Sequence, residues 1–341
     1  MALNSINLVQ ELRNNPFVLA PMAGITDNAF RSFMKEMGCG IVISELISAN
    51  GLNYGNKKTV DLMKFDKIQS PVGIQLFGET PEIVAEGAKF VQDQGADFVD
   101  LNFGCPVKKV VCKGAGSAML KDLDGIAKML STVRGAIQIP LTIKVRTGWD
   151  ANTRNTHEIA NIAYNEGISW MAIHGRTRTQ GYEGLADWDY IAEVKSKAKL
   201  PIIGNGDIHT PQQAVDRLNS SGCDAVMIGR GCLKNPWIFR QALNIYKRQN
   251  EKTDKNFIEL ICTLNTYLEK NFEPRTVGIQ LKKFSSWFSA GYPGSAQFRR
   301  DVFQYQTPKE VLDHAENYFH SIAHLTQIDT SGERFLMGGH G

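Results

Sequence analysis

Short runs of apolar residues recur along the first two-thirds of the chain, and each run ends in polar residues or glycine. Nearly continuous apolar segments of this length predict strands of a parallel sheet that is covered on both faces. The eight expected strands span residues 17–21, 41–44, 72–76, 98–102, 141–146, 170–175, 202–205 and 225–229.

Segments with helical periodicity lie between these strands, and several begin at a capping residue followed by proline, as at Thr80-Pro81 and Thr210-Pro211. The expected helices cover residues 28–37, 81–94, 123–134, 156–166, 188–196 and 211–220. Eight strands alternating with helices predict an α/β fold of the (β/α)8 TIM barrel type. The alternative is an open doubly wound sheet, which usually carries GxGxxG after its first strand, whereas APMAGITD stands here.

The pattern changes at the polar segment RQNEKTDKN, residues 248–256, which we interpret as a linker. Beyond it, residues 257–270, 275–289 and 308–325 have helical periodicity, and strand signals are absent. We therefore expect a catalytic barrel over residues 1–247, a small C-terminal helical domain over 255–328 and a loose tail over 329–341.

Composition and charge exclude some classes of protein. No apolar run reaches the roughly 18 residues of a membrane span, and the N-terminus lacks a secretion signal, so we expect a cytoplasmic protein without membrane contact. The net charge of +3 comes from 38 basic and 35 acidic residues. Only a local basic face, and not the overall charge, is therefore expected to bind nucleic acid.

Six cysteines are scattered along the chain without a CxxC pair. This spacing predicts neither a zinc site nor a disulfide framework, and no metal is expected. We interpret Cys223 and Cys262 as small buried hydrophobic residues. Cys112 has no evident chemical role and is interpreted as incidental, although a disulfide with Cys105 would suppress activity under oxidation.

In a (β/α)8 barrel the active site lies at the carboxyl ends of the strands. Seven expected strands end in polar or glycine-rich motifs, namely PMAG (21–24), QLFG (75–78), NFGCP (102–106), KVR (144–146), HGR (174–176), NGD (205–207) and GRG (229–231). The last two suit a phosphate site, because glycine lets backbone N–H groups approach an anion, although simple tight turns are the alternative. Lys144 and His174, with Gln75, are expected at the edge of a flavin ring rather than as a solvated charge and a core histidine.

Cys105 follows a strand and stands between glycine and proline, so its thiol is expected on a rigid turn. A thiol of ordinary pKa is mostly protonated at neutral pH. Such a group donates a proton to a developing carbanion. The alternative interpretation is a buried structural cysteine.

The segment NFGCPVKKVVCKGAGSAML, residues 102–120, resembles the active-cysteine signature of the tRNA-dihydrouridine synthases. LAPMAGITDNAFR, IPLTIKVRTGW, NGDI and AVMIGRGCLKNPWIF are similar to other segments of that family, and the likeness covers nearly the whole chain. Among the branches of the family, the KKV loop and the QFRRDVF segment most resemble the bacterial B-type subgroup.

The resemblance implies FMN in the barrel mouth, reduced by NADPH, and reduction of a uridine in tRNA. By this resemblance flavin N5 gives a hydride to C6 of the uridine and Cys105 gives a proton to C5. The flavin contacts it implies are Pro21, Met22, Ala23, Gln75, Lys144, His174, Asn205, Gly206, Asp207, Gly229 and Arg230. The first three back the flavin, Gln75 and Lys144 bind its ring or ribityl chain, His174 lies beside it, and the last five hold the ribityl and phosphate end.

The resemblance also implies contacts with RNA. Asn102 and Arg146 are expected to position the target base, which must leave its stack to enter the pocket. Lys108, Lys109 and Lys113, beside Cys105 in sequence, are expected to bind RNA phosphates. Candidate contacts in the helical domain are Lys270, Arg275, Lys282, Lys283, Arg299 and Arg300, with the aromatic residues Phe284, Trp287 and Phe288. For these aromatic residues, a place in the core is the favoured interpretation.

The sequence is also compatible with two other functions. A flavin barrel acting on a free small molecule, such as a dihydroorotate dehydrogenase-like or ene-reductase-like enzyme, would share the phosphate site but would need neither the helical domain nor the lysine-rich loop. A non-catalytic RNA-binding protein that kept the barrel would be colourless. A monomer is expected. No motif predicts which uridine is reduced, or whether the RNA is tRNA rather than ribosomal RNA.

Overall fold

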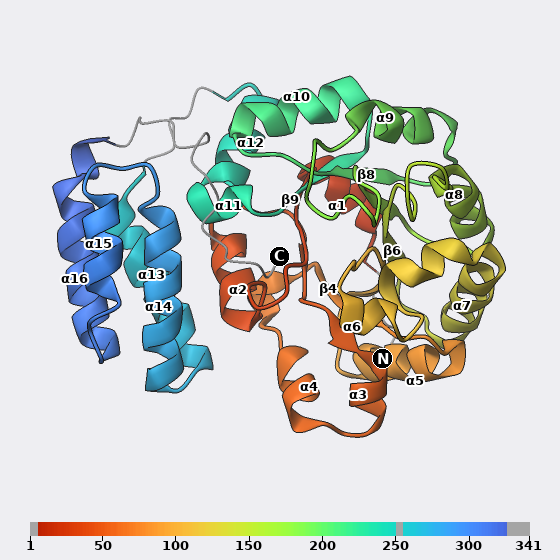
Figure 1. Ribbon diagram of the computed structural model, residues 1–341, viewed down its shortest axis with the longest axis horizontal. Helices are drawn as coiled ribbons and strands as arrows, with labels where there is room; N and C mark the ends of the chain where they lie inside the picture. Colours follow the sequence, from red (N-terminus) through yellow and green to blue (C-terminus); the bar gives the residue numbers. More distant parts are fainter. Residues whose placement is uncertain (1–5, 250–254, 326–341) are drawn as a thin grey trace.

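A parallel barrel forms the centre of the molecule, helices surround it, and a lobe of four further helices lies on one side (Figure 1). The computed structural model describes residues 6–249 and 255–325. Its strands are β1 (Phe17–Leu19), β2 (Val42–Ile43), β3 (Ile47–Ser48), β4 (Val72–Phe77), β5 (Phe98–Phe103), β6 (Leu141–Arg146), β7 (Met171–His174), β8 (Ile202–Asn205) and β9 (Ala225–Ile228).

The strands pair in the order β1-β9-β8-β7-β6-β5-β4-β2, and all of these pairs are parallel. A parallel bridge between Val18 and Ile41 joins β1 to the residue before β2 and closes the ring. Both β2 and β3 pair with β4, so these two short strands share one position of the barrel. The predicted (β/α)8 architecture is therefore confirmed, and β3 is the strand that the hydrophobic pattern missed.

The bounds of the helices that cover the barrel differ from the predicted bounds by at most two residues. They are α2 (Asn28–Glu36), α5 (Pro81–Asp93), α7 (Leu123–Ala136), α8 (Thr156–Asn165), α9 (Trp188–Lys197) and α10 (Pro211–Ser221). Helices that were not predicted from the sequence are α1 (Leu8–Asn14), α3 (Ala49–Asn53), α4 (Lys57–Leu62), α6 (Lys108–Val111), α11 (Gly231–Lys234) and α12 (Ile238–Tyr246). Most of these are too short to show a helical period. No helix of the described residues is long and apolar enough to cross a membrane.

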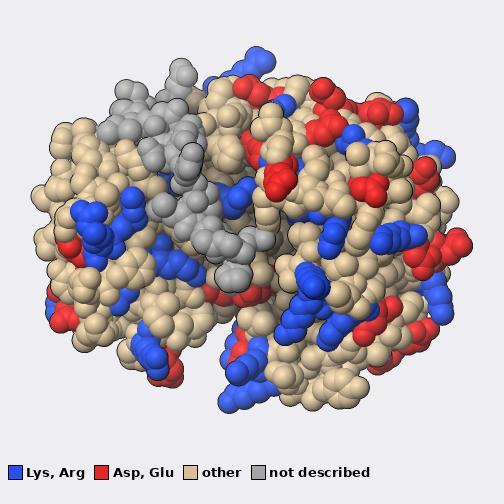
Figure 2. Space-filling model, in the orientation of Figure 1, with Lys and Arg blue, Asp and Glu red and all other residues tan. Residues whose placement is uncertain are grey.

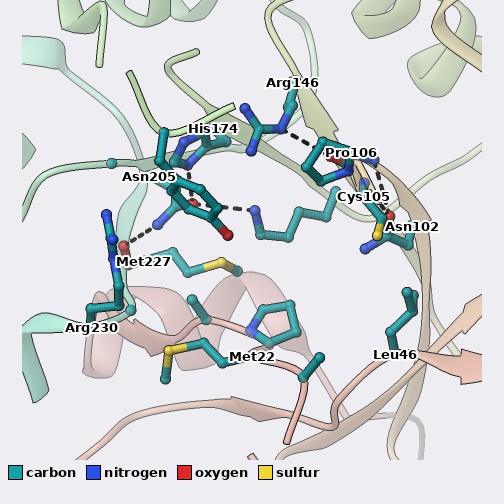
Figure 3. A pocket seen from close by; sticks show the side chains of 18 of the residues that line it. Met22, Leu46, Asn102, Cys105, Pro106, Arg146, His174, Asn205, Met227 and Arg230 are labelled. Carbon is teal, nitrogen blue, oxygen red and sulfur yellow. Dashed lines mark hydrogen bonds between the residues drawn. The ribbon is translucent and has the colours of Figure 1, made fainter. Parts of the chain in front are cut away.

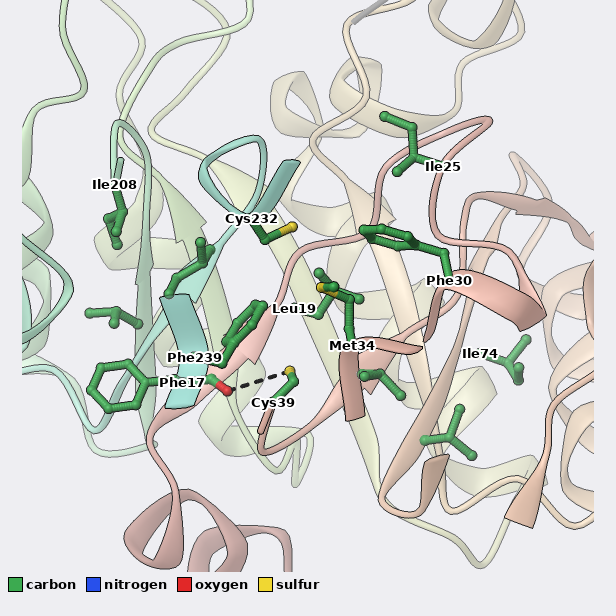
Figure 4. Packing of buried hydrophobic residues seen from close by; sticks show 14 of the residues in the cluster. Phe17, Leu19, Ile25, Phe30, Met34, Cys39, Ile74, Ile208, Cys232 and Phe239 are labelled. Carbon is green, nitrogen blue, oxygen red and sulfur yellow. Dashed lines mark hydrogen bonds between the residues drawn. The ribbon is translucent and has the colours of Figure 1, made fainter. Parts of the chain in front are cut away.

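Alternating residues of the strands face two separate cores. Phe17 and Leu19 of β1 pack outward against the helices, in the cluster that Figure 4 shows, whereas Val18 lies in an inner cluster within the barrel. Leu8 and Leu12 of α1 belong to the inner cluster and pack on the residues inside the barrel. Because α1 packs on one end of the barrel, a site can open at the other end, where the strands have their carboxyl ends.

The side lobe consists of α13 (Phe257–Asn271), α14 (Pro274–Phe288), α15 (Ser295–Val302) and α16 (Pro308–Ser321). Three of these helices were predicted, whereas α15 was missed because only Phe298 and Val302 of its residues are buried. The lobe packs on the barrel mainly through α13 and α2 (Figure 1). Phe284, Trp287 and Phe288 are buried, so their interpretation as core residues was right. The tail predicted over residues 329–341 lies outside the described residues.

One glycine of β4 makes room for an aromatic ring of the inner core. A Cβ atom on Gly73 would lie 2.2 Å from Cε2 of Phe98, whose ring packs edge-on against Trp170. We predict that Gly73→Ala lowers the free energy of unfolding by about 1–3 kcal/mol, the usual cost of overpacking a core. Urea unfolding followed by circular dichroism measures this change.

Gly135→Ala in α7 is the matched control, because a Cβ atom at this position would meet nothing within 4 Å. This substitution should leave the free energy of unfolding unchanged or raise it by up to about 1 kcal/mol. A Gly73→Ala variant as stable as Gly135→Ala would contradict the packing described for Phe98.

Candidate active site

A cavity of about 460 Å³ opens at the carboxyl ends of the strands, within the size range of cofactor sites. Figure 3 shows Cys105 and Asn102 on one side of it, Asn205 and Arg230 on the opposite side, and Met22 and Leu46 along a third. The sequence-predicted residues that line it are Pro21, Met22, Ala23, Gln75, Asn102, Cys105, Lys144, Arg146, His174, Asn205, Gly206, Asp207, Gly229 and Arg230. The strand-end motifs therefore converge on one cavity.

Other lining residues were not predicted from the sequence, including Leu46, Tyr182, Ile208, His209 and Met227. Met227 faces the barrel interior from β9, and the alternation of that strand was a signal that could have found it. Leu46 and Tyr182 stand in loops, where no periodicity indicates which way a side chain points.

Hydrogen bonds fix the peptide groups on both sides of Cys105. Its amide N donates to Oδ1 of Asn102 at 2.8 Å, and the amide N of Gly104 donates to the same oxygen at 3.1 Å. The carbonyl of Cys105 accepts from the hydroxyl of Ser117 at 2.8 Å, and Nε of Arg146 donates to the carbonyl of Gly104 at 2.9 Å. The backbone that carries the thiol is thus held from three neighbouring segments.

The side chain of Asn102 is itself held by a chain of buried polar groups. Nδ2 of Asn102 donates to Oε1 of Gln75 at 2.8 Å, and Nε2 of Gln75 donates to Asp100 at 2.7 Å. The hydroxyl of Thr142 donates to the other oxygen of Asp100 at 2.6 Å. Burial raises the pKa of Asp100 to about 6, although both hydrogen bonds oppose this shift. The carboxylate therefore stays mainly ionised at neutral pH and orients the two amides.

A second group of polar side chains meets at Asn205. Nδ2 of Asn205 donates to the carbonyl of Met227 at 2.7 Å, which directs its Oδ1 toward Lys144 at 3.2 Å and toward Nδ1 of His174 at 2.9 Å. Because that oxygen only accepts, Nδ1 of His174 carries the hydrogen. Burial, together with the charges of Lys144 and Arg146, holds the pKa of His174 well below its ordinary value. His174 is thus neutral, with Nε2 as an acceptor.

The Nε2 atom of His174 is buried and lacks a hydrogen-bond partner among the described groups. Burial, with the charge of Arg146, lowers the pKa of Lys144 to about 8, so this lysine is mostly charged at neutral pH. The cavity wall therefore offers an unpartnered acceptor beside positive charge, and Met22, Ala23 and Leu46 add apolar surface. This combination fits a flat ring with polar edges and an anionic tail, as FMN has.

The turn after β8 packs closely against the loop that carries Ala186. Gly206 has a φ of +134°, and a Cβ there would lie 2.5 Å from Cβ of Ala186. The carboxylate of Asp207 accepts from Arg176 at 2.9 Å and from the amide of Ala186 at 2.7 Å. Asp207 thus braces two loops, a role that was not predicted, and its contact with the ribityl or phosphate end stays a prediction.

Tyr182 stands at the cavity mouth between two basic side chains. The guanidinium carbon of Arg230 lies 4.8 Å from the centroid of the Tyr182 ring, and that of Arg146 lies 5.8 Å from the same centroid.

Among the described residues, no group of three or more His, Cys, Asp or Glu side chains is arranged to hold a metal ion.

The lysines expected to bind RNA stand outside the cavity. Lys108 and Lys109 are exposed on α6 and Lys113 is exposed on the turn that follows, so this segment begins as a short helix rather than as a loop. Figure 2 shows Lys and Arg side chains on both sides of the hollow between the lobe and the barrel. Of the lobe candidates, Lys270 pairs with Asp66, and Lys283 donates to the carbonyl of Gly24. Lys270 and Lys283 therefore have contacts within the protein.

The thiol of Cys105 is half-buried, and burial raises its pKa, while a backbone hydrogen bond at Val107 and the charge of Arg146 act in the opposite direction. Because only the thiolate reacts with iodoacetamide, we predict that Cys112, which is exposed, is alkylated before Cys105 at about pH 8. The Cys105 rate should rise about tenfold per pH unit until the pH reaches its pKa. Peptide mass spectrometry measures both rates, and faster alkylation of Cys105 than of Cys112 at neutral pH would indicate a nucleophile instead of an acid.

The chain is similar to known proteins over most of its length. A sequence model of the family described as Dihydrouridine synthase (Dus) matches residues 18–323. A protein of Rickettsia conorii named probable tRNA-dihydrouridine synthase is 36% identical, over 93% of this chain and 97% of its own. A protein of Xanthomonas campestris pv. campestris named tRNA-dihydrouridine synthase B is 38% identical, over 89% and 93%.

A protein of the same name from Vibrio cholerae is 35% identical, over 92% of this chain and 98% of its own. The structure of histamine dehydrogenase from Rhizobium sp. 4-9 superposes with a TM-score of 0.51 at 12% identity, over 74% of this chain and 49% of that one, which supports the fold alone. The chain belongs to the dihydrouridine synthase family and is similar to its B-type members.

Proposed function

We propose that this protein is a flavin-dependent tRNA-dihydrouridine synthase that reduces the C5=C6 bond of a uridine in tRNA. The observation that carries this function is the position of Cys105, whose backbone is held rigidly at the wall of a cavity that fits FMN. Burial raises the pKa of its thiol, which favours the protonated form. The family match and the relatives over nearly the full chain support the same reaction.

FMN is the proposed cofactor, and when bound it supplies the hydride that C6 of the uridine receives. Lys144 and His174 would hold its polar ring edge, and the turns at Gly206 and Gly229, with Arg230, would hold its phosphate end. The unpartnered Nε2 of His174 is suited to accept from an N–H group of the ring. NADPH is proposed as the reductant on the family resemblance.

Cys105 donates its proton to C5 of the uridine, so the base gains one hydride and one proton across the double bond. Its raised pKa keeps the proton on Sγ until negative charge develops on the base. The nearby charge of Arg146 stabilises the thiolate that forms, which then takes a proton from solvent. Asn102 and Arg146 keep the thiol in position and are proposed to contact the base as well.

The tRNA is proposed to bind across the hollow between the barrel and the helical lobe, with its target base extruded into the cavity. Lys108, Lys109 and Lys113, beside the cavity, would contact phosphates. We assign residues 1–247 to the FMN-binding domain and 255–328 to the RNA-binding domain, of which the last three residues lie outside the described chain.

A monomer in the cytoplasm is proposed. The free thiols among the described residues are compatible with a reducing compartment, where disulfides are rare.

The substrate distinguishes this function from reduction of a free small molecule. We predict that the reduced, FMN-loaded protein, mixed anaerobically with tRNA that lacks dihydrouridine, regains the yellow absorbance of oxidised flavin and converts uridine to dihydrouridine. Fully modified tRNA is the control and should give no change. Reoxidation by orotate or by an enone, without reoxidation by tRNA, would contradict the proposed function.

A further inference from the structure

The barrel and the helical lobe meet along a seam that passes beside the flavin cavity. Met22, Ala23 and Ile25, in the loop between β1 and α2, line the cavity. The helix that follows this loop, α2, packs on α13 of the lobe, and the rings of Phe30 and Phe284 stack with centroids 4.9 Å apart (Figure 1). One continuous segment thus faces the cofactor at one end and the lobe at the other.

The centre of this loop, Gly24, is held from both sides. Its amide N donates to Oε2 of Glu45 in the barrel at 2.7 Å, and its carbonyl accepts from Nζ of Lys283 in α14 at 3.0 Å. Gly24 has a φ of +69°, a left-handed conformation that favours glycine. Two charged side chains, one from the barrel and one from the lobe, therefore fix the orientation of the peptides on either side of one residue.

Lys283 is surrounded by groups that hold its ammonium in this place. It lies 4.7 Å from the ring centroid of Phe284 and 5.5 Å from that of Trp287. Burial lowers the pKa of Lys283, whereas the nearby carboxylates of Asp27 and Glu45 oppose this shift and favour the charged form. Asp27 also caps α2 by accepting from the amide of Phe30. The lysine thus belongs to a cluster of charged and aromatic side chains at the seam.

The same loop is also fixed at its far end. Arg31, which is fully buried, donates to the carbonyls of Thr26 and Lys64 and to Oε1 of Gln69. The Met22–Thr26 turn is closed further by a bond from the amide of Met22 to the hydroxyl of Thr26. The barrel secures both ends of the loop, and Lys283 is a contact through which the lobe acts on its centre.

We propose that Lys283 is a positioning residue that fixes the flavin-facing loop, residues 22–26, and so makes the geometry of the cofactor site depend on how the helical lobe is seated. The lobe then contributes to the reaction through this lysine as well as through RNA contacts. The flavin part of this inference rests on the proposed function, whereas the effect on the loop does not.

The test compares Lys283→Met, which keeps the stem and removes the ammonium, with Tyr267→Phe. Tyr267 donates to Glu36 across the same seam at 2.6 Å but does not line the cavity, so its variant is a matched control. Hydrogen exchange of amides 22–26 is measured on the full chain without flavin. FMN affinity, and the kcat and KM for tRNA, are then measured on the same proteins.

We expect faster exchange over residues 22–26 and roughly tenfold weaker FMN binding in Lys283→Met, the order of effect of losing one charged hydrogen bond. At saturating FMN, kcat should fall while the KM for tRNA stays unchanged, because the lysine is bonded within the protein. Lys283→Arg should restore these values in large part, and Tyr267→Phe should match the wild type.

Wild-type exchange and FMN affinity in Lys283→Met would overturn the proposal, and so would equal changes in Tyr267→Phe, which would indicate general loosening of the seam. A rise in the KM for tRNA alone would make Lys283 an RNA contact instead. If Lys283→Met does not fold, Lys283→Gln is assessed by the same measurements. A failure of the proposed function would leave the exchange result intact, because that measurement needs neither flavin nor RNA.

Discussion

The hydrogen bond from the amide of Cys105 to the side chain of Asn102 is the constraint on which the site depends. It ties a loop to strand β5, and the chain through Gln75 ends at the carboxylate of Asp100 inside the barrel. A buried polar group without a hydrogen-bond partner destabilises the fold, so this series of hydrogen bonds holds its side chains in one arrangement. The backbone that carries the thiol is therefore held rigidly, and burial raises the pKa of the thiol.

Much of the fold could be predicted because parallel strands buried on both faces form continuous apolar runs. The ends of Leu141–Arg146 and Ile202–Asn205 agree with the prediction at both termini. Elements without a clear period could not be found in this way. The two-residue strand β3 is too short to show alternation, and α15 buries too few apolar side chains to show a stripe.

The cavity could be predicted because barrel strands bring their carboxyl ends together, but the partners of each side chain could not. Arg146 was expected to position the uridine base, and it also donates to the carbonyl of Gly104. Asp207 was expected to contact the cofactor, and it also accepts from Arg176. Lys283 was expected to contact RNA, and it donates a hydrogen bond to the carbonyl of Gly24. Such pairings join residues far apart in sequence, and no local pattern encodes them.

The most direct test of the central claim is a single-turnover measurement of uridine reduction by Cys105→Ala, loaded with FMN and reduced by NADPH. Proton donation by a positioned side chain contributes roughly 100- to 10,000-fold, so the variant should retain flavin binding and flavin reduction but lose uridine reduction to this extent. Cys112→Ala, just after the short helix α6, should react as the wild type does. Reduction of the RNA by Cys105→Ala at the wild-type rate would contradict the role of this thiol.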